Sequence, residues 1–202
     1  LLPLLLASPQ TKAQGIMLTP KWTAQAQFTG YYVADKLGFY KEEGIDVCVQ
    51  HPAISESSFS FMEKGRAPVV IMNLSYAFME RLAGARVVNV MQTSQENSLM
   101  LISHSPLKGE ESLRNQKIAV WNHLSQKLLD RLAEHYALKQ VEWIRFNSGV
   151  NVFLSGAADP CLVGSYNEYL QLSEYGMNVD SIYSIRLADY GYNLPEDGLY
   201  VT

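Results

Sequence analysis

The chain has 202 residues, of which 48% are hydrophobic and 18% are charged, as is typical of a globular protein with a sizeable core. Its formal net charge of -4 and its lack of a basic cluster argue against a nucleic-acid partner. No apolar run reaches the length of a membrane-spanning helix. The sequence therefore predicts no membrane span. His, Asp and Glu do not recur at metal-ligand spacing, so the sequence predicts no metal site either.

The first residues, Leu-Leu-Pro-Leu-Leu-Leu-Ala-Ser, form a short apolar run that is followed by small residues near 11–13. This pattern is typical of the end of a secretory signal peptide, so residues 1–15 predict the remnant of an export signal. Export implies a periplasmic or extracellular location. Because the run is short and contains Pro3, an ordinary amino-terminal strand or tail remains an alternative.

Residues 16–49 predict a β-α-β unit. Apolar and β-branched residues indicate strands at 16–19 and 45–49, and the apolar side chains between them recur at helical spacing up to Gly38. Trp22 follows the first strand. In open α/β sheets, ligands bind at the carboxyl ends of strands, so Trp22 is a candidate ligand-binding residue, although spacing alone fits a core residue equally well.

Strands and helices alternate along the rest of the chain, which predicts α/β architecture with mostly parallel sheets. The expected helices lie at 54–62, 76–83, 122–136, 150–154 and 165–174, and the expected strands at 67–72, 86–91, 99–102, 117–121, 141–146, 161–163 and 181–185.

A polar, turn-rich segment at 104–109 marks the expected domain boundary. The predicted first lobe comprises 16–103 with 195–202, and the second comprises 104–194. Cys48 and Cys161 each fall in a predicted buried strand, one in each lobe; free thiols are favoured, and a disulfide between them is the alternative.

The segments Trp-Thr-Ala-Gln-Ala-Gln-Phe-Thr-Gly-Tyr-Tyr-Val-Ala at 22–34 and Gly-Phe-Tyr-Lys-Glu-Glu-Gly-Ile-Asp-Val at 38–47 resemble the NMT1/THI5-like family of solute-binding proteins and pyrimidine synthases in thiamine metabolism. Segments near 155–169 and 189–198 resemble its second half in the same order. The resemblance implies the type 2 periplasmic-binding-protein fold, with two α/β lobes and a ligand cleft. It also implies a chain truncated at its C-terminus, whose first lobe exposes apolar surface.

The resemblance further implies a site for a thiamine pyrimidine precursor, either a hydroxymethyl- or a formamido-aminopyrimidine. Trp22 and Tyr166 would stack on the ring, and Glu168 would accept hydrogen bonds from its amino group. Without the resemblance, Glu168 reads as a carboxylate that stabilises a helix amino terminus. Weaker ligand-binding candidates, each of which could equally be a cap or packing residue, are Tyr31, Asn73, Ser75, Trp121 and Tyr190.

The predicted function is that of a solute-binding protein for an ABC importer, with a small-molecule ligand and a transporter permease as partners and with no catalytic residue or cofactor. One alternative is a protein that binds riboflavin, a sulfonate or nitrate, although Glu168 would repel an anion and the proposed slot contains no Arg. The other is a pyrimidine synthase. The enzymes of the family carry a cysteine-rich segment where this chain has Tyr-Gly-Tyr-Asn-Leu-Pro-Glu-Asp at 190–197, which argues against a synthase.

Overall fold

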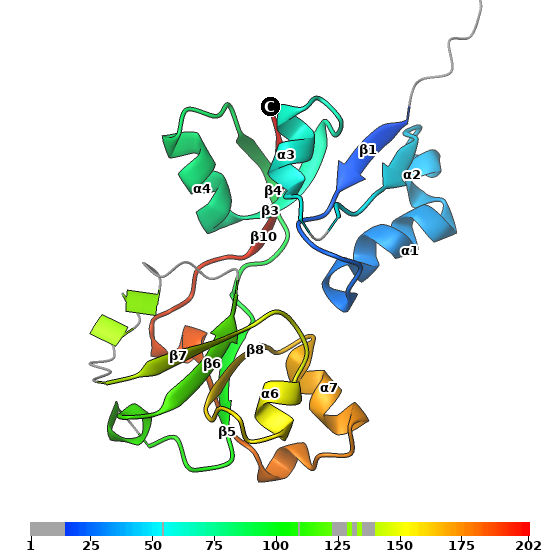
Figure 1. Cartoon of the computed structure of the whole chain (residues 1–202). Helices are drawn as coiled ribbons and strands as arrows, with labels where there is room; N and C mark the ends of the chain where they lie inside the picture. The colour runs from blue at the N-terminus through cyan, green and yellow to red at the C-terminus, as the bar shows by residue number, and fades with distance from the viewer. Residues whose placement is uncertain (1–14, 54, 109, 123–128, 131–132, 135–139) are drawn as a thin grey trace, which may run out of the picture. The chain divides into compact units, whose positions relative to one another are not determined.

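The computed structural model describes residues 15–53, 55–108, 110–122, 129–130, 133–134 and 140–202 (Figure 1). The chain divides into two compact units, which we call unit 1 (Leu1–Met91 with Gly198–Thr202) and unit 2 (Gln92–Asp197). The predicted signal remnant and most of the predicted helix at 122–136 lie outside the described residues.

Unit 1 is built on a five-stranded sheet with the strand order β2-β1-β3-β10-β4. Its strands are β1 (Ile16–Thr19), β2 (Val47–Val49), β3 (Val69–Asn73), β4 (Val88–Gln92) and β10 (Asp197–Val201). Because β1 pairs in parallel with both β2 and β3, the β-α-β unit predicted at 16–49 is confirmed.

Capping residues set the ends of two helices of unit 1. Helix α1 (Thr29–Leu37) ends because Gly38 adopts a φ of 82°, a left-handed conformation that glycine takes at little cost. Helix α3 (Ser58–Glu63) begins at Ser57, whose side chain accepts a hydrogen bond from the backbone N–H of Ser60 at 3.1 Å. The described part of this unit also contains η1 (Ala26–Phe28), α2 (Phe39–Glu42) and α4 (Leu74–Leu82).

Unit 1 exposes large apolar side chains on α4 and on the edge strand β4. Phe78 and Leu82 of α4 are 59% and 68% exposed, and Val90 of β4 is 55% exposed. Helix α4 nevertheless buries Ala77 in a core cluster with residues of α3 and β3. The helix therefore has apolar residues on its outer side as well as on its inner side.

Unit 2 is built on a second five-stranded sheet with the order β7-β6-β8-β5-β9. Its strands are β5 (Leu99–Ser103), β6 (Lys117–Trp121), β7 (Glu142–Phe146), β8 (Cys161–Gly164) and β9 (Tyr183–Arg186). Strand β6 runs parallel to β7 and β8, whereas β5 runs antiparallel to β8 and β9. The expectation of mostly parallel sheets is therefore wrong for β5.

The domain boundary predicted at His104 is also wrong. Strand β5 hydrogen-bonds into the sheet of unit 2, so the boundary lies between Met91 and Gln92, one strand earlier than expected. The polar segment that suggested the boundary is a connection within unit 2. An apolar strand before a polar turn looks the same in sequence whichever sheet it joins.

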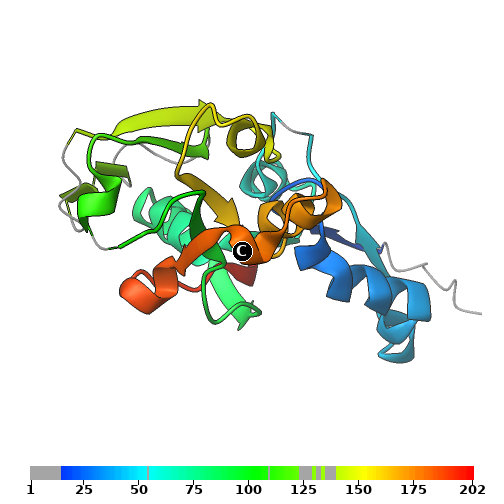
Figure 2. The same cartoon turned by 90° about the horizontal axis from the view of Figure 1, so that it is seen from below.

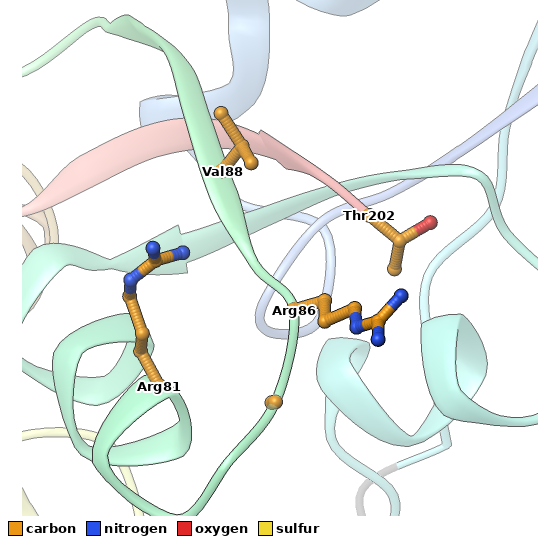
Figure 3. Close-up of a pocket in the computed structure, with 5 residues that line it drawn as sticks. Arg81, Arg86, Val88 and Thr202 are labelled. Atoms are coloured by element: carbon orange, nitrogen blue, oxygen red, sulfur yellow. The ribbon is translucent and has the colours of Figure 1, made fainter.

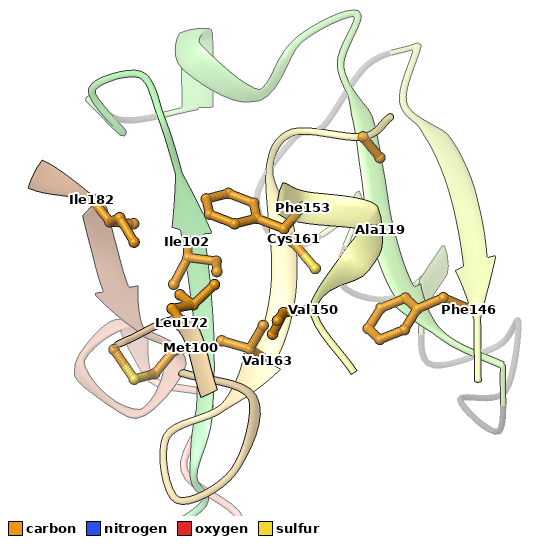
Figure 4. Packing of buried hydrophobic residues seen from close by; sticks show 11 residues of the cluster. Met100, Ile102, Ala119, Phe146, Val150, Phe153, Cys161, Val163, Leu172 and Ile182 are labelled. Carbon is orange, nitrogen blue, oxygen red and sulfur yellow. The ribbon is translucent and has the colours of Figure 1, made fainter. Parts of the chain in front are cut away.

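Helices α6 (Asn151–Leu154) and α7 (Glu168–Glu174) lie side by side in unit 2 (Figures 1 and 2). Phe153 of α6 and Leu172 of α7 are fully buried with Ile102 of β5 in one core cluster, which Figure 4 shows. Among its described residues, unit 2 also contains the short 3-10 helices η2 (Glu110–Leu113), η3 (Val179–Ser181) and η4 (Leu187–Tyr190). In the part of the chain that the structure describes, no helix is long and apolar enough to span a membrane.

The two cysteines differ in environment. Cys161 is buried in β8, as predicted, but Cys48 is exposed on β2, and both thiols are free. Strand β2 is an edge strand, and along it Val47 and Val49 are half-buried while Cys48 points to the other face. The prediction of a buried Cys48 failed because an edge strand covers only one of its faces.

Candidate functional site

Strands β1 and β3 are parallel neighbours, so the residues that follow them lie at the same edge of the sheet of unit 1. At this edge Nζ of Lys21 donates to Oδ1 of Asn73 at 2.5 Å. The strand-end position of Asn73 was predicted, whereas Lys21 was missed. Lys21 places a cation beside Trp22, at an edge where the sequence argument had considered only arginine.

The loop that carries Trp22 is held by His51, which the sequence did not single out. Nδ1 of His51 hydrogen-bonds to the carbonyl oxygen of Trp22, and Nε2 lies 2.6 Å from the Tyr32 hydroxyl. A carbonyl oxygen only accepts, so Nδ1 carries the proton and Nε2 accepts from Tyr32. The Tyr32 hydroxyl also hydrogen-bonds to the backbone of Gln25, and burial raises the pKa of Tyr32. Through His51, these hydrogen bonds connect the loop at Trp22 to Tyr32 of α1.

Trp22 itself is half-buried. Its ring packs, together with those of Tyr31 and Tyr32, against a buried cluster that contains Leu18 and Phe28. The indole therefore rests on the core of unit 1 and keeps part of its surface accessible, as a stacking platform for a flat ligand requires.

Glu168 is the most constrained of the predicted residues. Glu168 is the first residue of α7, in the predicted position near a helix amino terminus, and it is only 5% exposed. Oε1 accepts from the indole Nε1 of Trp121 at 3.3 Å and from Nδ2 of Asn167 at 3.0 Å, and Oε2 accepts from the backbone N–H of Gly164 at 3.1 Å. The carboxylate thus ties the ends of β6 and β8 to the start of α7.

Gly164 allows two predicted residues to come together in unit 2. A Cβ at this position would lie 3.3 Å from Oε2 of Glu168 and 3.6 Å from Cζ of Tyr166. The Tyr166 ring and the Glu168 carboxylate therefore both lie over residue 164. The structure brings Tyr166, Glu168 and Trp121 into one cluster at the carboxyl ends of β6 and β8.

The Tyr166 hydroxyl lies in an acidic environment. Burial raises the pKa of Tyr166 well above its ordinary value, and the charges of Glu196, Asp197 and Glu168 raise it further. Among the acidic residues that raise this pKa, Glu196 accepts a hydrogen bond at its Oε2 from Oγ of Ser98 at 2.9 Å. Neither Ser98 nor Glu196 was predicted, because their contact joins residues that are 98 positions apart.

The other predicted residues are less enclosed. Ser75 is exposed in the first turn of α4, which begins two residues earlier than expected, and Tyr190 is 51% exposed at the end of η4. Tyr31 packs beside Trp22. Within the described residues, no group of three or more His, Cys, Asp or Glu side chains is placed to hold a metal ion.

A pocket of about 480 Å³ opens on unit 1 (Figure 3). It is lined by Arg81, Ala85, Arg86, Val88 and Thr202. Nη1 of Arg81 donates to the carbonyl oxygen of Val87 at 2.7 Å, which ties α4 to the start of β4. No predicted ligand-binding residue lines this pocket.

Several solved structures that superpose on this chain are named as substrate-binding proteins of ABC transporters. The periplasmic aliphatic sulphonate binding protein of Escherichia coli superposes with a TM-score of 0.66 at 14% identity, covering 93% of this chain and 61% of that one. An ABC transporter protein from Parabacteroides distasonis gives a TM-score of 0.62 at 14% identity, covering 93% and 66%. The predicted type 2 periplasmic-binding-protein fold is thereby confirmed.

Curated relatives are named for pyrimidine synthesis. A 4-amino-5-hydroxymethyl-2-methylpyrimidine phosphate synthase of Saccharomyces cerevisiae is 19% identical over 160 residues, which are 76% of this chain and 47% of the yeast protein. An enzyme of the same name from Candida albicans is 20% identical over 149 residues, 71% of this chain and 44% of that protein. The chain therefore spans about half the length of the curated relatives it matches.

The family model described as NMT1/THI5 like matches residues 25–202. This match covers most of the chain and includes the Tyr166 and Glu168 cluster of unit 2, together with all but the first residues of the Trp22 motif. The predicted resemblance is confirmed, and the chain belongs to the NMT1/THI5-like family.

Proposed function

We propose that this protein is the solute-binding protein of an ABC importer and that its ligand is a thiamine pyrimidine precursor, a hydroxymethyl- or formamido-aminopyrimidine. The placement of the Tyr166 ring beside the Glu168 carboxylate over Gly164 is the observation that carries this proposal. An aromatic face beside a carboxylate suits a flat ring that bears an amino group. The fold supports the transport role, and the names of the curated relatives support the pyrimidine.

In this proposal the protein is exported, works with a membrane permease and carries out no reaction itself. Trp22 and Tyr166 are the ring contacts. Tyr31, Asn73, Ser75, Trp121 and Tyr190 are the secondary candidates. The segment 190–197 contains no thiol, and this departure from the cysteine-rich segment of the family's enzymes supports binding over synthesis.

The hydrogen bonds of Glu168 limit what it can offer a ligand. A carboxylate has about four acceptor positions, and three are used by Trp121, Asn167 and Gly164. Among the contacts of the described residues, one acceptor position on Oε2 is unused, and we assign it to a ligand N–H. We propose that Glu168 fills this role while it also holds the site together.

A second candidate is an oxyanion such as a sulfonate or nitrate. Lys21 at the edge of unit 1 favours it, because its ammonium group lies next to Trp22 in the chain. The carboxylates around Tyr166 in unit 2 oppose it. Arg145 adds a cation in unit 2, where its Nη1 donates to the carbonyl oxygen of Trp121 at 3.4 Å. Because Glu168, Glu196 and Asp197 together place more negative charge around Tyr166, the aminopyrimidine is preferred.

Calorimetric titration with hydroxymethyl- and formamido-aminopyrimidines, thiamine, riboflavin, taurine and nitrate tests the proposal. We expect binding of at least one aminopyrimidine and no heat from taurine or nitrate. Binding of taurine or nitrate without any pyrimidine would refute the pyrimidine assignment. Riboflavin binding alone would replace it with a flavin.

A further inference from the structure

Two neighbouring side chains fill one oxygen of the Glu168 carboxylate. Oε1 accepts from the indole Nε1 of Trp121 at 3.3 Å and from Nδ2 of Asn167 at 3.0 Å. A carboxylate oxygen has about two acceptor positions, so these donors saturate Oε1. Oε2 accepts from the backbone N–H of Gly164 at 3.1 Å and, among the described contacts, keeps its second position. The two oxygens of this carboxylate are therefore not equivalent toward a ligand.

Both donors to Oε1 are themselves oriented by the fold. Trp121 ends β6, where the centroid of its ring lies 6.3 Å from that of Phe146. Its indole has a single N–H, which Glu168 uses. The amide of Asn167 is oriented by Gln171, whose Nε2 donates to Oδ1 of Asn167 at 2.8 Å. Because a carboxylate only accepts, Nδ2 of Asn167 is the atom that faces Glu168.

The saturation of Oε1 decides which ligand groups Glu168 can accept. Amidinium and guanidinium groups pair with a carboxylate through two parallel N–H bonds, one to each oxygen. At Glu168, which is only 5% exposed, the second of these bonds would have to displace Trp121 or Asn167 and leave that donor without its acceptor. A ring with one amino group needs only a single bond, to Oε2, and displaces neither donor.

We propose that Trp121 and Asn167 are positioning residues that set the specificity of unit 2: by saturating Oε1 of Glu168, they favour ligands that offer it a single N–H and disfavour amidinium and guanidinium cations. This inference rests on the proposed function and deepens it, because it names the group that the site accepts and the group that it rejects. The negative charges around Tyr166 attract cations of every shape. Discrimination between donors must therefore come from the acceptor geometry.

Calorimetric titration tests the inference by comparing 4-amino-5-hydroxymethyl-2-methylpyrimidine with benzamidine, whose amidinium group offers two parallel N–H donors. Trp121→Phe keeps an aromatic ring but removes the indole N–H, and Asn167→Ala removes the other donor to Oε1. Each variant should shift the ratio of affinities toward benzamidine by about tenfold or more, the effect of one hydrogen bond to a charged group. Trp143→Phe is the matched control and should keep the wild-type ratio, because Trp143 is a half-buried indole of β7 that packs near Leu162 and does not donate to Glu168.

A purely structural role for Trp121 and Asn167 would weaken both compounds alike. An unchanged ratio in the variants would therefore overturn the inference. Urea unfolding shows which variants fold, and if one of the two does not fold, the other decides.

If the wild-type protein binds no pyrimidine, the proposed function fails separately. Aniline then replaces the pyrimidine, because it carries one amino group on the same ring as benzamidine. A ratio that moves toward benzamidine in the variants, or benzamidine binding that is present only in them, would still support the inference. Variants that bind benzamidine no better than the wild-type protein would overturn it.

The hydrogen bond between Trp121 and Glu168 is also tested without ligand, by ¹⁵N NMR of the indole N–H groups. Trp121→Phe identifies the signal of Trp121. Glu168→Ala should speed the exchange of this N–H with solvent, because the N–H loses its acceptor, while the N–H of Trp143 keeps its rate. Glu174→Ala, at an exposed position on α7, is the control. An unchanged rate for Trp121 in Glu168→Ala would remove the basis of the inference.

Discussion

A single histidine fixes the loop that carries Trp22, and its two ring nitrogens have different roles. His51→Ala should destabilise unit 1 by about 1–2 kcal/mol, since each lost hydrogen bond contributes roughly 0.5–1.5 kcal/mol. His51→Asn can still donate to the Trp22 carbonyl and should recover part of this loss. Urea unfolding followed by circular dichroism measures both effects. Gln50→Ala, at the neighbouring exposed position, is the control, and equal stabilities of His51→Ala and Gln50→Ala would contradict this role.

Glu168→Gln should destabilise unit 2 even without ligand. A glutamine side chain has one acceptor oxygen and one donor NH₂, whereas Trp121, Asn167 and Gly164 all donate to Glu168. Whichever way the amide turns, it faces at least one N–H with its own NH₂, which leaves buried donors unpaired. The expected cost is about 1–3 kcal/mol, measurable as a lower urea midpoint. The control Glu174→Gln on the exposed side of the same helix should leave the midpoint unchanged.

At the scale of single residues, the sequence could predict those residues that are candidates because they directly follow a strand or begin a helix. Trp22 after β1, and Glu168 at the start of α7, are of this kind. It could not predict Lys21 with Asn73, His51 with Trp22, or Ser98 with Glu196, because these contacts join residues 52, 29 and 98 positions apart. Only tertiary packing brings such pairs together.

The two free thiols should differ in reactivity, because Cys48 lies on the edge strand β2 and Cys161 lies on the central strand β8. Burial in β8, together with the charges of Glu168 and Asp159, raises the pKa of Cys161 to about 12. Thiol reagents attack the thiolate, so Cys161 should be inert at pH 8 while the exposed Cys48 of β2 reacts. A chromogenic disulfide reagent should titrate one thiol in the native protein and two in denaturant. Cys48→Ser should abolish the native reaction; rapid reaction of two thiols without denaturant would contradict the burial of Cys161.

At the scale of elements, hydrophobic periodicity predicted most strands and helices to within a few residues, as β6 at 117–121 and α1 ending at Gly38 illustrate. It did not predict the direction in which β5 pairs or the sheet to which it belongs. Direction depends on which strands become neighbours, and β5 pairs with β8 and β9, which lie about 60 to 85 residues later in the chain. A local pattern carries no information about such partners.

At the scale of the whole molecule, the proposal that one ligand uses residues of both units leads to a prediction about stability. A ligand that binds only the folded protein stabilises it by about 2.7 kcal/mol at a concentration of 100 times its Kd. For a chain of this size, such a gain raises the apparent melting temperature by roughly 5–10 °C. Under the same conditions, 4-amino-5-hydroxymethyl-2-methylpyrimidine should therefore raise the melting temperature of wild-type protein by this amount.

Trp22→Ala and Tyr166→Ala should each reduce that shift at the same ligand concentration, because each removes one stacking surface worth about 1–3 kcal/mol of affinity. Every variant is compared with its own ligand-free melting temperature, so that loss of stability is separated from loss of binding. Tyr175→Ala, which removes a tyrosine that is 63% exposed, should keep the full shift. A full shift in Trp22→Ala, with none in Tyr166→Ala, would assign the ligand to unit 2 alone and contradict a role for Trp22 in binding.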